Sequence, residues 1–254
     1  MAGYIIAIPA RFASTRLPGK PLLDVGGMPM IRRVCLQALK TKAERVVACV
    51  DSEKVAAALE GTDAEVCMTP EDAKSGTDRI GFMIRQLGID AGTTVVNIQG
   101  DEPLIDPAHI DLVANILAEK NADMSSLCAR MRNYYDVMDP NIVKVVMDRE
   151  GYAMYFSRAP IPYERDYFRD SENHELHFPH YHHFGLYAYK AGTVLKFLEL
   201  EQSENELSEM LEQLRLMHYG FRIAMAVTDS PPHPGIDTSE DLKRVNAILA
   251  GDEA

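Results

Sequence analysis

The sequence predicts an α/β fold of one domain, in which helices cover both faces of a mainly parallel, mixed sheet. Short apolar runs that suit buried strands alternate with helical patterns through the first half of the chain. No internal repeat and no low-complexity linker interrupts residues 1–254. A chain of 254 residues is long enough to bury one large core, so we expect a single domain.

In the first half, each of the first four predicted strands is followed by a predicted helix. Residues 4–8 form an apolar run that ends before Pro9, as a strand buried on both faces does. Pro29 suits the start of a helix, and apolar residues recur with helical spacing from 30 to 39. Further strands are expected at 45–50, 65–68, 94–99 and 124–129, and further helices at 53–59, 80–87 and 107–120.

Beyond residue 130 the alternation breaks. Short strands are predicted at 143–147 and 153–156, and a polar, aromatic and proline-containing segment follows at 160–181. We interpret 130–182 as an excursion with a dimerisation arm, because 160–181 does not have the composition of a packed layer. The chain then returns with strands at 184–189 and 223–227 and helices at 191–200, 208–218 and 239–249.

The composition is ordinary for a globular protein, but the charge is acidic. Hydrophobic residues make up 46% and charged residues 25% of the chain, and the net charge is -12. The apolar runs are too short to cross a bilayer, and no export signal begins the chain, which predicts a cytoplasmic protein without membrane insertion. Without a long basic run, binding to nucleic acid is disfavoured. The four Cys residues are scattered and are interpreted as buried packing residues.

A positively charged loop follows the first predicted strand. It carries Arg11, Arg16 and Lys20, and no Asp or Glu occurs before Asp24. Two Pro and a Gly interrupt regular structure there. Such a loop suits phosphate groups, with side-chain cations and backbone amides as ligands. The alternative at this stage is a solvated basic loop without a ligand.

The charged loop lacks the phosphate-binding motif of nucleoside triphosphatases. That motif requires a Gly five positions before the Gly-Lys pair and a Ser or Thr after it. This chain has Ser14 and Pro21 at those positions. Ordinary ATPase chemistry is therefore disfavoured.

Two carboxylates follow in loops that can face the same cleft. Asp101 lies just beyond strand 94–99, and Asp237 precedes the last predicted helix. Ligands of parallel sheets bind beyond the carboxyl ends of the strands, where the charged loop also lies. Carboxylates beside phosphates are the usual setting for Mg²⁺. Alternatively, Asp237 begins a turn or caps the last helix.

Three further groups of residues have both structural and functional interpretations. Five His residues occur within 174–183, and their irregular spacing without Cys favours a functional imidazole in a loop over a transition-metal site. Glu212 either pairs with Arg215 on a helix surface or joins Gln213 in contacting a polyhydroxylated ligand. Arg158 follows an apolar strand and binds either a ligand carboxylate or an acidic neighbour.

Several motifs occur in order along nearly the whole chain. They lie at 9–11, 14–22, 75–79, 97–103, 155–158, 183–187, 211–215 and 235–238. The most specific are the charged loop and Gln99-Gly100-Asp101-Glu102-Pro103. Together they resemble the 3-deoxy-manno-octulosonate (KDO) cytidylyltransferases, or CMP-KDO synthetases. The resemblance implies a Rossmann-like nucleotidyltransferase that transfers a cytidylyl group from CTP to KDO and releases pyrophosphate, for lipopolysaccharide biosynthesis.

The resemblance also implies roles for individual residues. It implies nucleotide contacts by Ala10, Arg11, Arg16, Lys20, Ser75 and Arg79. It implies sugar contacts by Gln99, Arg158, His183, Tyr187, Glu212 and Gln213. Asp101 and Asp237 would bind Mg²⁺ and, with Arg11 and Lys20, form the catalytic set. A homodimer is expected through the arm.

Two departures from the family pattern keep the acceptor open. This chain has His182-His183-Phe184-Gly185 where Arg-His-Leu-Gly is expected, and residues 204–208 also differ. The acceptor is KDO, an 8-amino or otherwise modified KDO, or another sugar acid such as a nonulosonic acid. More distant alternatives are a glycosyltransferase of similar sheet topology and a nucleotide-sensing module without turnover.

Overall fold

The computed structural model describes residues 3–13, 17–169, 172, 174–229, 233 and 235–251. Its strands are β1 (Tyr4–Ala10), β2 (Arg45–Val50), β3 (Glu65–Met68), β4 (Thr94–Asn97), β5 (Met124–Met131), β6 (Lys144–Met147), β7 (Ala153–Ser157), β8 (His180–Lys190) and β9 (Ile223–Thr228). Its helices are the 3₁₀ turn η1 (Lys20–Leu22), α1 (Met30–Ala38), α2 (Glu53–Ala57), α3 (Gly76–Gln86), α4 (Pro107–Lys120), α5 (Tyr134–Met138), α6 (Ala191–Phe197), α7 (Glu204–Glu209), α8 (Gln213–His218) and α9 (Ser239–Ala250).

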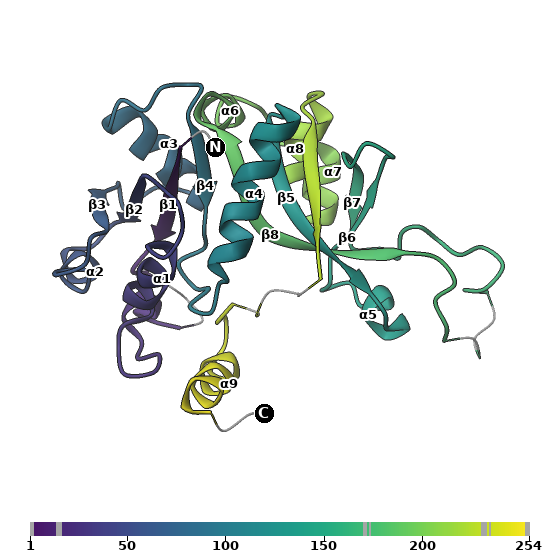
Figure 1. The fold of residues 1–254 in the computed structure, drawn as a ribbon, viewed down its shortest axis with the longest axis horizontal. Coiled ribbons are helices and arrows are strands. Elements are labelled where there is room, and N and C mark those ends of the chain that lie inside the picture. Colours follow the sequence, from purple (N-terminus) through teal and green to yellow (C-terminus); the bar gives the residue numbers. More distant parts are fainter. Residues whose placement is uncertain are drawn as a thin grey trace.

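Within the described residues, nine strands form one continuous sheet (Figure 1). The main path is β3-β2-β1-β4-β8-β5-β9, and β6 and β7 form a hairpin beside β8. Along the main path β8 alone runs against the others, because it pairs antiparallel with both β4 and β5. The remaining neighbours on this path are parallel. The predicted mainly parallel, mixed sheet is therefore confirmed.

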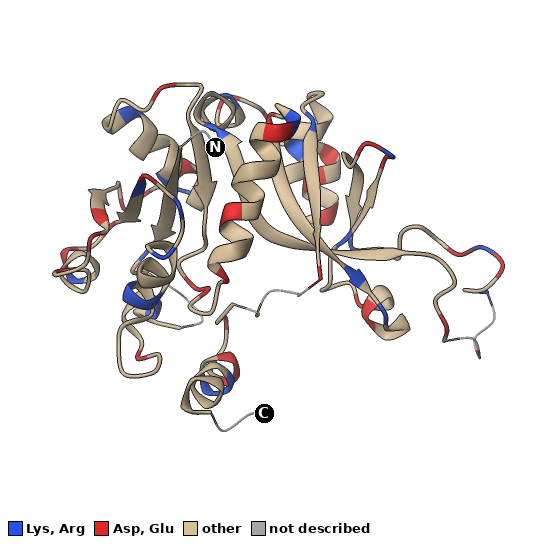
Figure 2. Cartoon of the chain, in the orientation of Figure 1, with Lys and Arg blue, Asp and Glu red and all other residues tan. Residues whose placement is uncertain are grey.

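Strand β1 shows why both faces of the sheet need helices. All seven of its residues are buried, and they alternate between two cores. Ile6 and Ile8 pack with residues of α1 and α4, whereas Ile5 and Ala7 pack with residues of α3 and α6 on the other face. In Figure 2 the central strands are almost entirely without charged residues, which lie on the helices and loops. All four Cys are buried and unpaired, as predicted.

The elements predicted at 208–218 and 184–189 differ from the structure. The helix expected at 208–218 is two helices, α7 and α8, separated by Met210 in the left-handed conformation (φ 53°). Strand β8 begins at His180 rather than at 184, and pairs with β5 from there onward. Its first residues are aromatic or polar, so the apolar pattern that marks the rest of the strand is missing there. The short helix α5 and the turn η1 were not predicted.

The described residues of the arm predicted at 160–181 lie between β7 and the first residues of β8, and they project from the body of the molecule (Figure 1). Glu164 anchors the arm: its buried carboxylate accepts hydrogen bonds from the backbone N–H groups of His177 and Phe178 and from His180 Nε2. Among the residues described, no three His, Cys, Asp or Glu side chains converge as a metal site. The interpretation of 174–183 as a loop is wrong at its end, where His180 and His183 are buried in β8.

None of the described helices combines the length and apolar character needed to span a bilayer.

Candidate active site

A buried ion pair holds the start of the charged loop against α3. The Phe12 backbone N–H donates to Asp51 Oδ1 at 2.8 Å, and Arg79 Nη2 donates to Asp51 Oδ2 at 2.8 Å. The side chains of Asp51 and Arg79 are only 6% and 3% exposed. Arg79 Nη1 also donates to Thr69 Oγ1 and to the Pro70 carbonyl. Arg79 thus lines the site, but its guanidinium is hydrogen-bonded to protein groups that hold the loop in place. Its predicted nucleotide contact stays a prediction.

The two cations at either end of the charged loop face a cavity of about 430 Å³, which we call the phosphate cavity. Arg11 is exposed directly after β1, with Ala10 beside it in the cavity wall. Gly19 adopts a left-handed conformation (φ 67°), and the chain enters η1 with Lys20 as its first residue. Arg16 lies outside the described residues, so its predicted contact stays a prediction.

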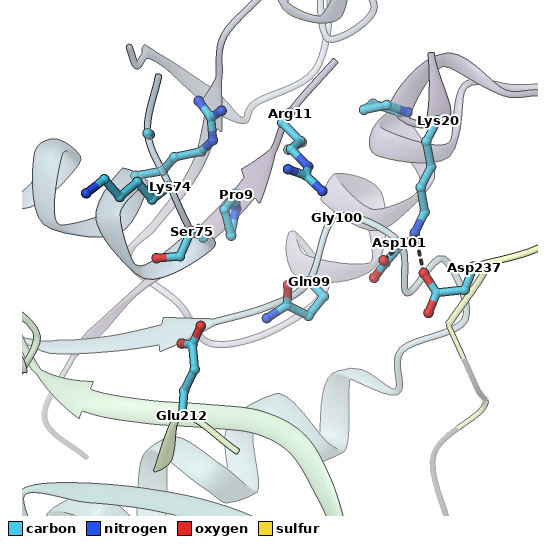
Figure 3. Close-up of a pocket in the computed structure, with 15 residues that line it drawn as sticks. Pro9, Arg11, Lys20, Lys74, Ser75, Gln99, Gly100, Asp101, Glu212 and Asp237 are labelled. Atoms are coloured by element: carbon cyan, nitrogen blue, oxygen red, sulfur yellow. Dashed lines mark hydrogen bonds and ion pairs between the residues drawn. The ribbon is translucent and has the colours of Figure 1, made fainter. Parts of the chain in front are cut away.

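The N-terminus of α3 forms the opposite wall of the phosphate cavity (Figure 3). Ser75 caps the helix: its Oγ accepts from the Asp78 N–H at 3.1 Å, and its own N–H donates to Asp78 Oδ2 at 2.8 Å. A helix N-terminus carries partial positive charge and suits an anion. Lys74 lines the same wall and was not predicted, because an exposed Lys before a helix carries no distinguishing signal.

The loop after β4 requires glycine at Gly100. A Cβ atom there would lie 2.9 Å from the Pro9 carbonyl oxygen and 3.1 Å from the Ala10 Cβ. The loop therefore passes directly against the end of β1, with Gln99 and Asp101 on either side of Gly100 facing the phosphate cavity (Figure 3). The absent side chain is what lets these two residues share a site with the charged loop.

Asp101 and Asp237 converge on one position, which the Lys20 ammonium occupies. Lys20 Nζ lies 2.6 Å from Asp101 Oδ2 and 3.0 Å from Asp237 Oδ1 (Figure 3). The two loops are also joined through the backbone, because the Ile236 N–H donates to the Asp101 carbonyl at 2.9 Å. Two carboxylates that share one cation, beside a cavity for phosphates, are a donor set that fits Mg²⁺. Their role as metal ligands stays a prediction.

A second cavity of about 350 Å³, the acceptor cavity, adjoins the phosphate cavity. Gly76, Gln99 and Glu212 line both, so the two cavities are direct neighbours. The acceptor cavity combines polar side chains, among them Tyr187 and Gln213, with an apolar wall of Met124, Val194, Phe197 and Leu216. Four of the predicted sugar contacts, Gln99, Tyr187, Glu212 and Gln213, therefore lie together.

Glu212 stands where the two cavities meet and does not form the surface ion pair with Arg215. Arg215 binds Glu206 instead, with Nε 2.8 Å from Glu206 Oε2. Glu212 Oε2 accepts a hydrogen bond from Thr77 Oγ1 at 3.3 Å. Although Glu212 is accessible from the cavity, the surrounding protein displaces enough water to raise its pKa. The first of the two interpretations, a surface pair with Arg215, is thus wrong, and the residue is available to a ligand.

Two residues that line the acceptor cavity each have a buried side-chain atom without a hydrogen-bond partner among the described residues. They are Asn97 Oδ1 and Gln213 Nε2, on side chains of residues only 4% and 5% exposed. Gln213 Oε1 accepts from the Tyr187 hydroxyl at 3.3 Å. An unpaired buried polar group costs about 1–3 kcal/mol. A ligand hydroxyl, which both donates and accepts, would remove that cost.

Asn97 was not predicted as a site residue, although the sequence held a signal. Val95 and Asn97 are two apart on β4, so their side chains lie on the same face of the sheet. A polar residue at a buried, otherwise apolar strand position needs hydrogen-bond partners, and the described residues supply none for Asn97 Oδ1.

Glu102 also lines the acceptor cavity. Burial, with a smaller contribution from the charge of Asp101, raises the pKa of Glu102 to about 8. A carboxyl group with a raised pKa is protonated over much of the neutral range and can then donate a hydrogen bond. The motif pointed to Asp101, and nothing in the sequence alone distinguished Glu102 beside it.

Two predicted sugar contacts lie outside the linings of both cavities. Arg158 Nε donates to the Glu209 carbonyl at 2.7 Å and Nη1 to the Pro140 carbonyl at 2.9 Å. His183 lies behind Tyr187, with ring centroids 5.6 Å apart, and its Nε2 is 2.9 Å from Ser126 Oγ. Burial lowers the pKa of His183 to about 3, so this imidazole is neutral. Their predicted sugar contacts stay predictions.

The comparisons with known proteins agree with this geometry. Over 97% of this chain, 46% of residues are identical to a 3-deoxy-manno-octulosonate cytidylyltransferase of Aeromonas salmonicida, with 99% of that protein covered. The enzyme of the same name from Haemophilus influenzae is 44% identical over 97% of this chain and 98% of its own length. A solved structure of CMP:2-keto-3-deoxy-manno-octonic acid synthetase complexed with CTP matches with a TM-score of 0.89 and 34% identity, covering 99% of this chain and all of that one.

A cytidylyltransferase from Leptospira borgpetersenii shares the fold, with a TM-score of 0.63 at 16% identity over all of this chain and 89% of that one. Residues 5–223 match the protein family described as Cytidylyltransferase. The match begins within β1 and ends at the start of β9, so it includes the residues that line both cavities except Asp237. With the near full-length relatives, it shows that the chain belongs to the cytidylyltransferase family.

Proposed function

We propose that this chain transfers the cytidylyl group of CTP to the sugar acid KDO and releases pyrophosphate, giving the CMP-sugar used in lipopolysaccharide assembly. The observation that carries the proposal is the pair of adjoining cavities, one suited to phosphates and one to a polyhydroxylated ligand, which share Gln99 and Glu212. The near full-length relatives named for this reaction support the choice of both substrates.

The arrangement of charges accounts for the chemistry. The anomeric hydroxyl of the sugar attacks the α-phosphorus in line with the departing pyrophosphate, which brings two anions together. Arg11, Lys20 and the N-terminus of α3 surround the phosphate cavity and would neutralise the triphosphate. Gln99, at the boundary of the two cavities, would orient the sugar toward the nucleotide.

Asp101 and Asp237 would hold Mg²⁺, because their oxygens already converge on one cation. Bound there, the metal would neutralise phosphate charge and polarise the attacking hydroxyl. We expect Asp101→Ala to remove activity without unfolding the protein. Full activity of this variant in Mg²⁺ would contradict the metal assignment.

KDO is favoured over a modified sugar acid because the departures from the family pattern lie outside the cavity linings. Of residues 182–185 and 204–208, Gly185 alone lines the acceptor cavity, and Gly185 matches the family pattern. Pyrophosphate release from CTP and Mg²⁺, with and without KDO, tests the reaction. Faster turnover of 8-amino-KDO or a nonulosonic acid in side-by-side assays would reassign the acceptor, and CTP binding without release for any of them would indicate a sensor.

The chain is further proposed to act in the cytoplasm, where CTP is made, as a homodimer formed through the arm. Tyr163, Tyr167 and Phe178 of the arm are 54%, 37% and 55% exposed, an apolar surface suited to a second copy. A monomeric mass by light scattering at working concentration would refute the dimer.

A further inference from the structure

Lys20 lies between the two carboxylates that would bind the metal, and its position affects metal binding. Its side chain is 15% exposed, and its ammonium is within hydrogen-bond distance of both Asp101 and Asp237. Mg²⁺ bound by these carboxylates would need the same oxygens, and two cations cannot share so small a space without strong repulsion. Lys20 and the metal therefore compete for one position.

We propose that Lys20 is a stand-in cation that neutralises the metal ligands in the free protein and moves to the phosphates when the nucleotide arrives, so that metal and CTP bind with positive coupling. This inference rests on the proposed metal site. The Lys side chain is a compact charge on a flexible four-carbon stem, which suits an exchange between carboxylate and phosphate partners. The phosphate cavity adjoins its present position, because Lys20, Asp101 and Asp237 all line it.

The carboxylates remain in place when Lys20 leaves. The Asp101 and Asp237 loops are joined by the hydrogen bond from the Ile236 N–H to the Asp101 carbonyl, which does not involve Lys20. The Asp237 N–H also donates to Asp241 Oδ2 at 3.1 Å, within the capping box of α9. The backbone that carries the two carboxylates is thus held in place independently of the Lys20 ammonium.

Lys20→Met tests the exchange because it keeps the length of the side chain and removes its charge. We expect this variant to bind Mn²⁺ without nucleotide at least about tenfold more tightly than the wild type does, in the range typical of coupled sites. Titration followed by the paramagnetic resonance signal of free Mn²⁺ measures this without turnover. Adding CTP should tighten Mn²⁺ binding strongly in the wild type and much less in the variant.

Lys74→Met is the matched control. Lys74 lines the same cavity and carries the same charge, but it makes no described contact with either carboxylate. If general electrostatics governed metal affinity, both Lys variants would bind Mn²⁺ equally well, and the proposal would fail. It would also fail if Lys20→Met bound Mn²⁺ no more tightly than the wild type.

Asp101→Asn separates this inference from the metal site on which it rests. Loss of Mn²⁺ binding in Asp101→Asn, with CTP present, supports the site itself. If that site holds and Lys20→Met shows no gain, the stand-in role alone is overturned. Mn²⁺ binding that is unchanged in Asp101→Asn overturns both. Thermal melting of each variant confirms that it is folded, and Mg²⁺ alone should raise the melting temperature of Lys20→Met more than that of the wild type.

Discussion

Gly100 is the residue at which the smallest chemical change should do the most damage to the site. In Gly100→Ala the new methyl group would lie 2.9 Å from the Pro9 carbonyl oxygen, a backbone atom that cannot rotate away. We expect a loss of about 1–3 kcal/mol of stability from the overpacking. A loss of about 100-fold in kcat/KM should accompany it, because Gln99 and Asp101 move together relative to the charged loop.

Gly92→Ala is the control for this change, since a Cβ at Gly92 meets nothing within 4 Å. It should leave both melting temperature and steady-state kinetics close to those of the wild type. Wild-type kinetics in Gly100→Ala would show that the loop after β4 does not depend on close contact with β1.

At the scale of single residues, site residues that belong to a sequence motif were predictable. Residues whose role depends on their tertiary surroundings were not. Asp101, Asp237 and Lys20 come from three distant segments, and the structure brings them together as expected. The polar side chain of Asn97 in a buried strand was a signal, but the lack of a hydrogen-bond partner for its Oδ1 is visible only in the structure. The engagement of Arg158 with two backbone carbonyls likewise depends on tertiary contacts that no local pattern encodes.

At the scale of elements, the Asp51–Arg79 ion pair joins β2, α3 and the charged loop. Asp51→Ala would leave the Arg79 guanidinium buried and without its charge partner. We expect a loss of about 3–5 kcal/mol in the free energy of unfolding, measured by urea denaturation. The reason is that an uncompensated buried charge costs more than the pair itself contributes.

The exposed pair between Arg45 and Glu65 provides the comparison, because these side chains are 34% and 46% exposed. Glu65→Ala should cost only about 0–1 kcal/mol, since water screens the pair and solvates the remaining Arg. Equal losses in the two variants would show that burial does not set the strength of the inner pair.

The turn between α7 and α8 is fixed to β7 by Glu209. Its carboxylate accepts from Ser157 Oγ at 2.6 Å and from the Arg158 N–H at 2.8 Å. After the turn at Met210, Glu212 lies in the lining of the acceptor cavity. We expect Glu209→Ala to raise the KM for the sugar acid about 10–100-fold while the KM for CTP changes little.

Glu204→Ala, on the exposed start of the same helix, should change neither KM. If Glu209→Ala raised both KM values alike, Glu209 would serve the fold in general and not the acceptor cavity. The same turn explains why the sequence predicted one helix at 208–218. The helical spacing continues through it, and the left-handed Met210 that ends α7 follows Glu209, whose tertiary contacts no local pattern encodes.

At the scale of the whole molecule, the sheet was predictable because its strands are buried on both faces and read as continuous apolar runs. β1, β2 and β4 are of this kind, and each was found within a few residues of its expected bounds. The order of strands was not predictable in the same way. The insertion of β8 between β4 and β5, against the direction of its neighbours, follows from the return of the chain after the arm.

The protein as a whole should lose stability in mild acid through His183. Burial, with a smaller effect from His182, lowers the pKa of His183 to about 3, against about 6.5 in an unfolded chain. Between these values the unfolded state binds a proton that the folded state does not, so stability falls as the pH drops below about 6.5 and is unaffected above it. From pH 7.5 to 5.5 this one group should lower the free energy of unfolding by about 1.4 kcal/mol.

His183→Gln removes the titrating group but keeps a polar side chain near Ser126. Between pH 7.5 and 5.5, the free energy of unfolding of this variant should therefore fall by about 1.4 kcal/mol less than that of the wild type. This holds even if the variant is less stable than the wild type at both pH values. His218→Gln, at the exposed end of α8, should retain the wild-type dependence. If urea denaturation gave the same pH dependence for His183→Gln and the wild type, His183 would have to be protonated within the fold, which its burial among Phe156, Tyr187 and Ser126 opposes.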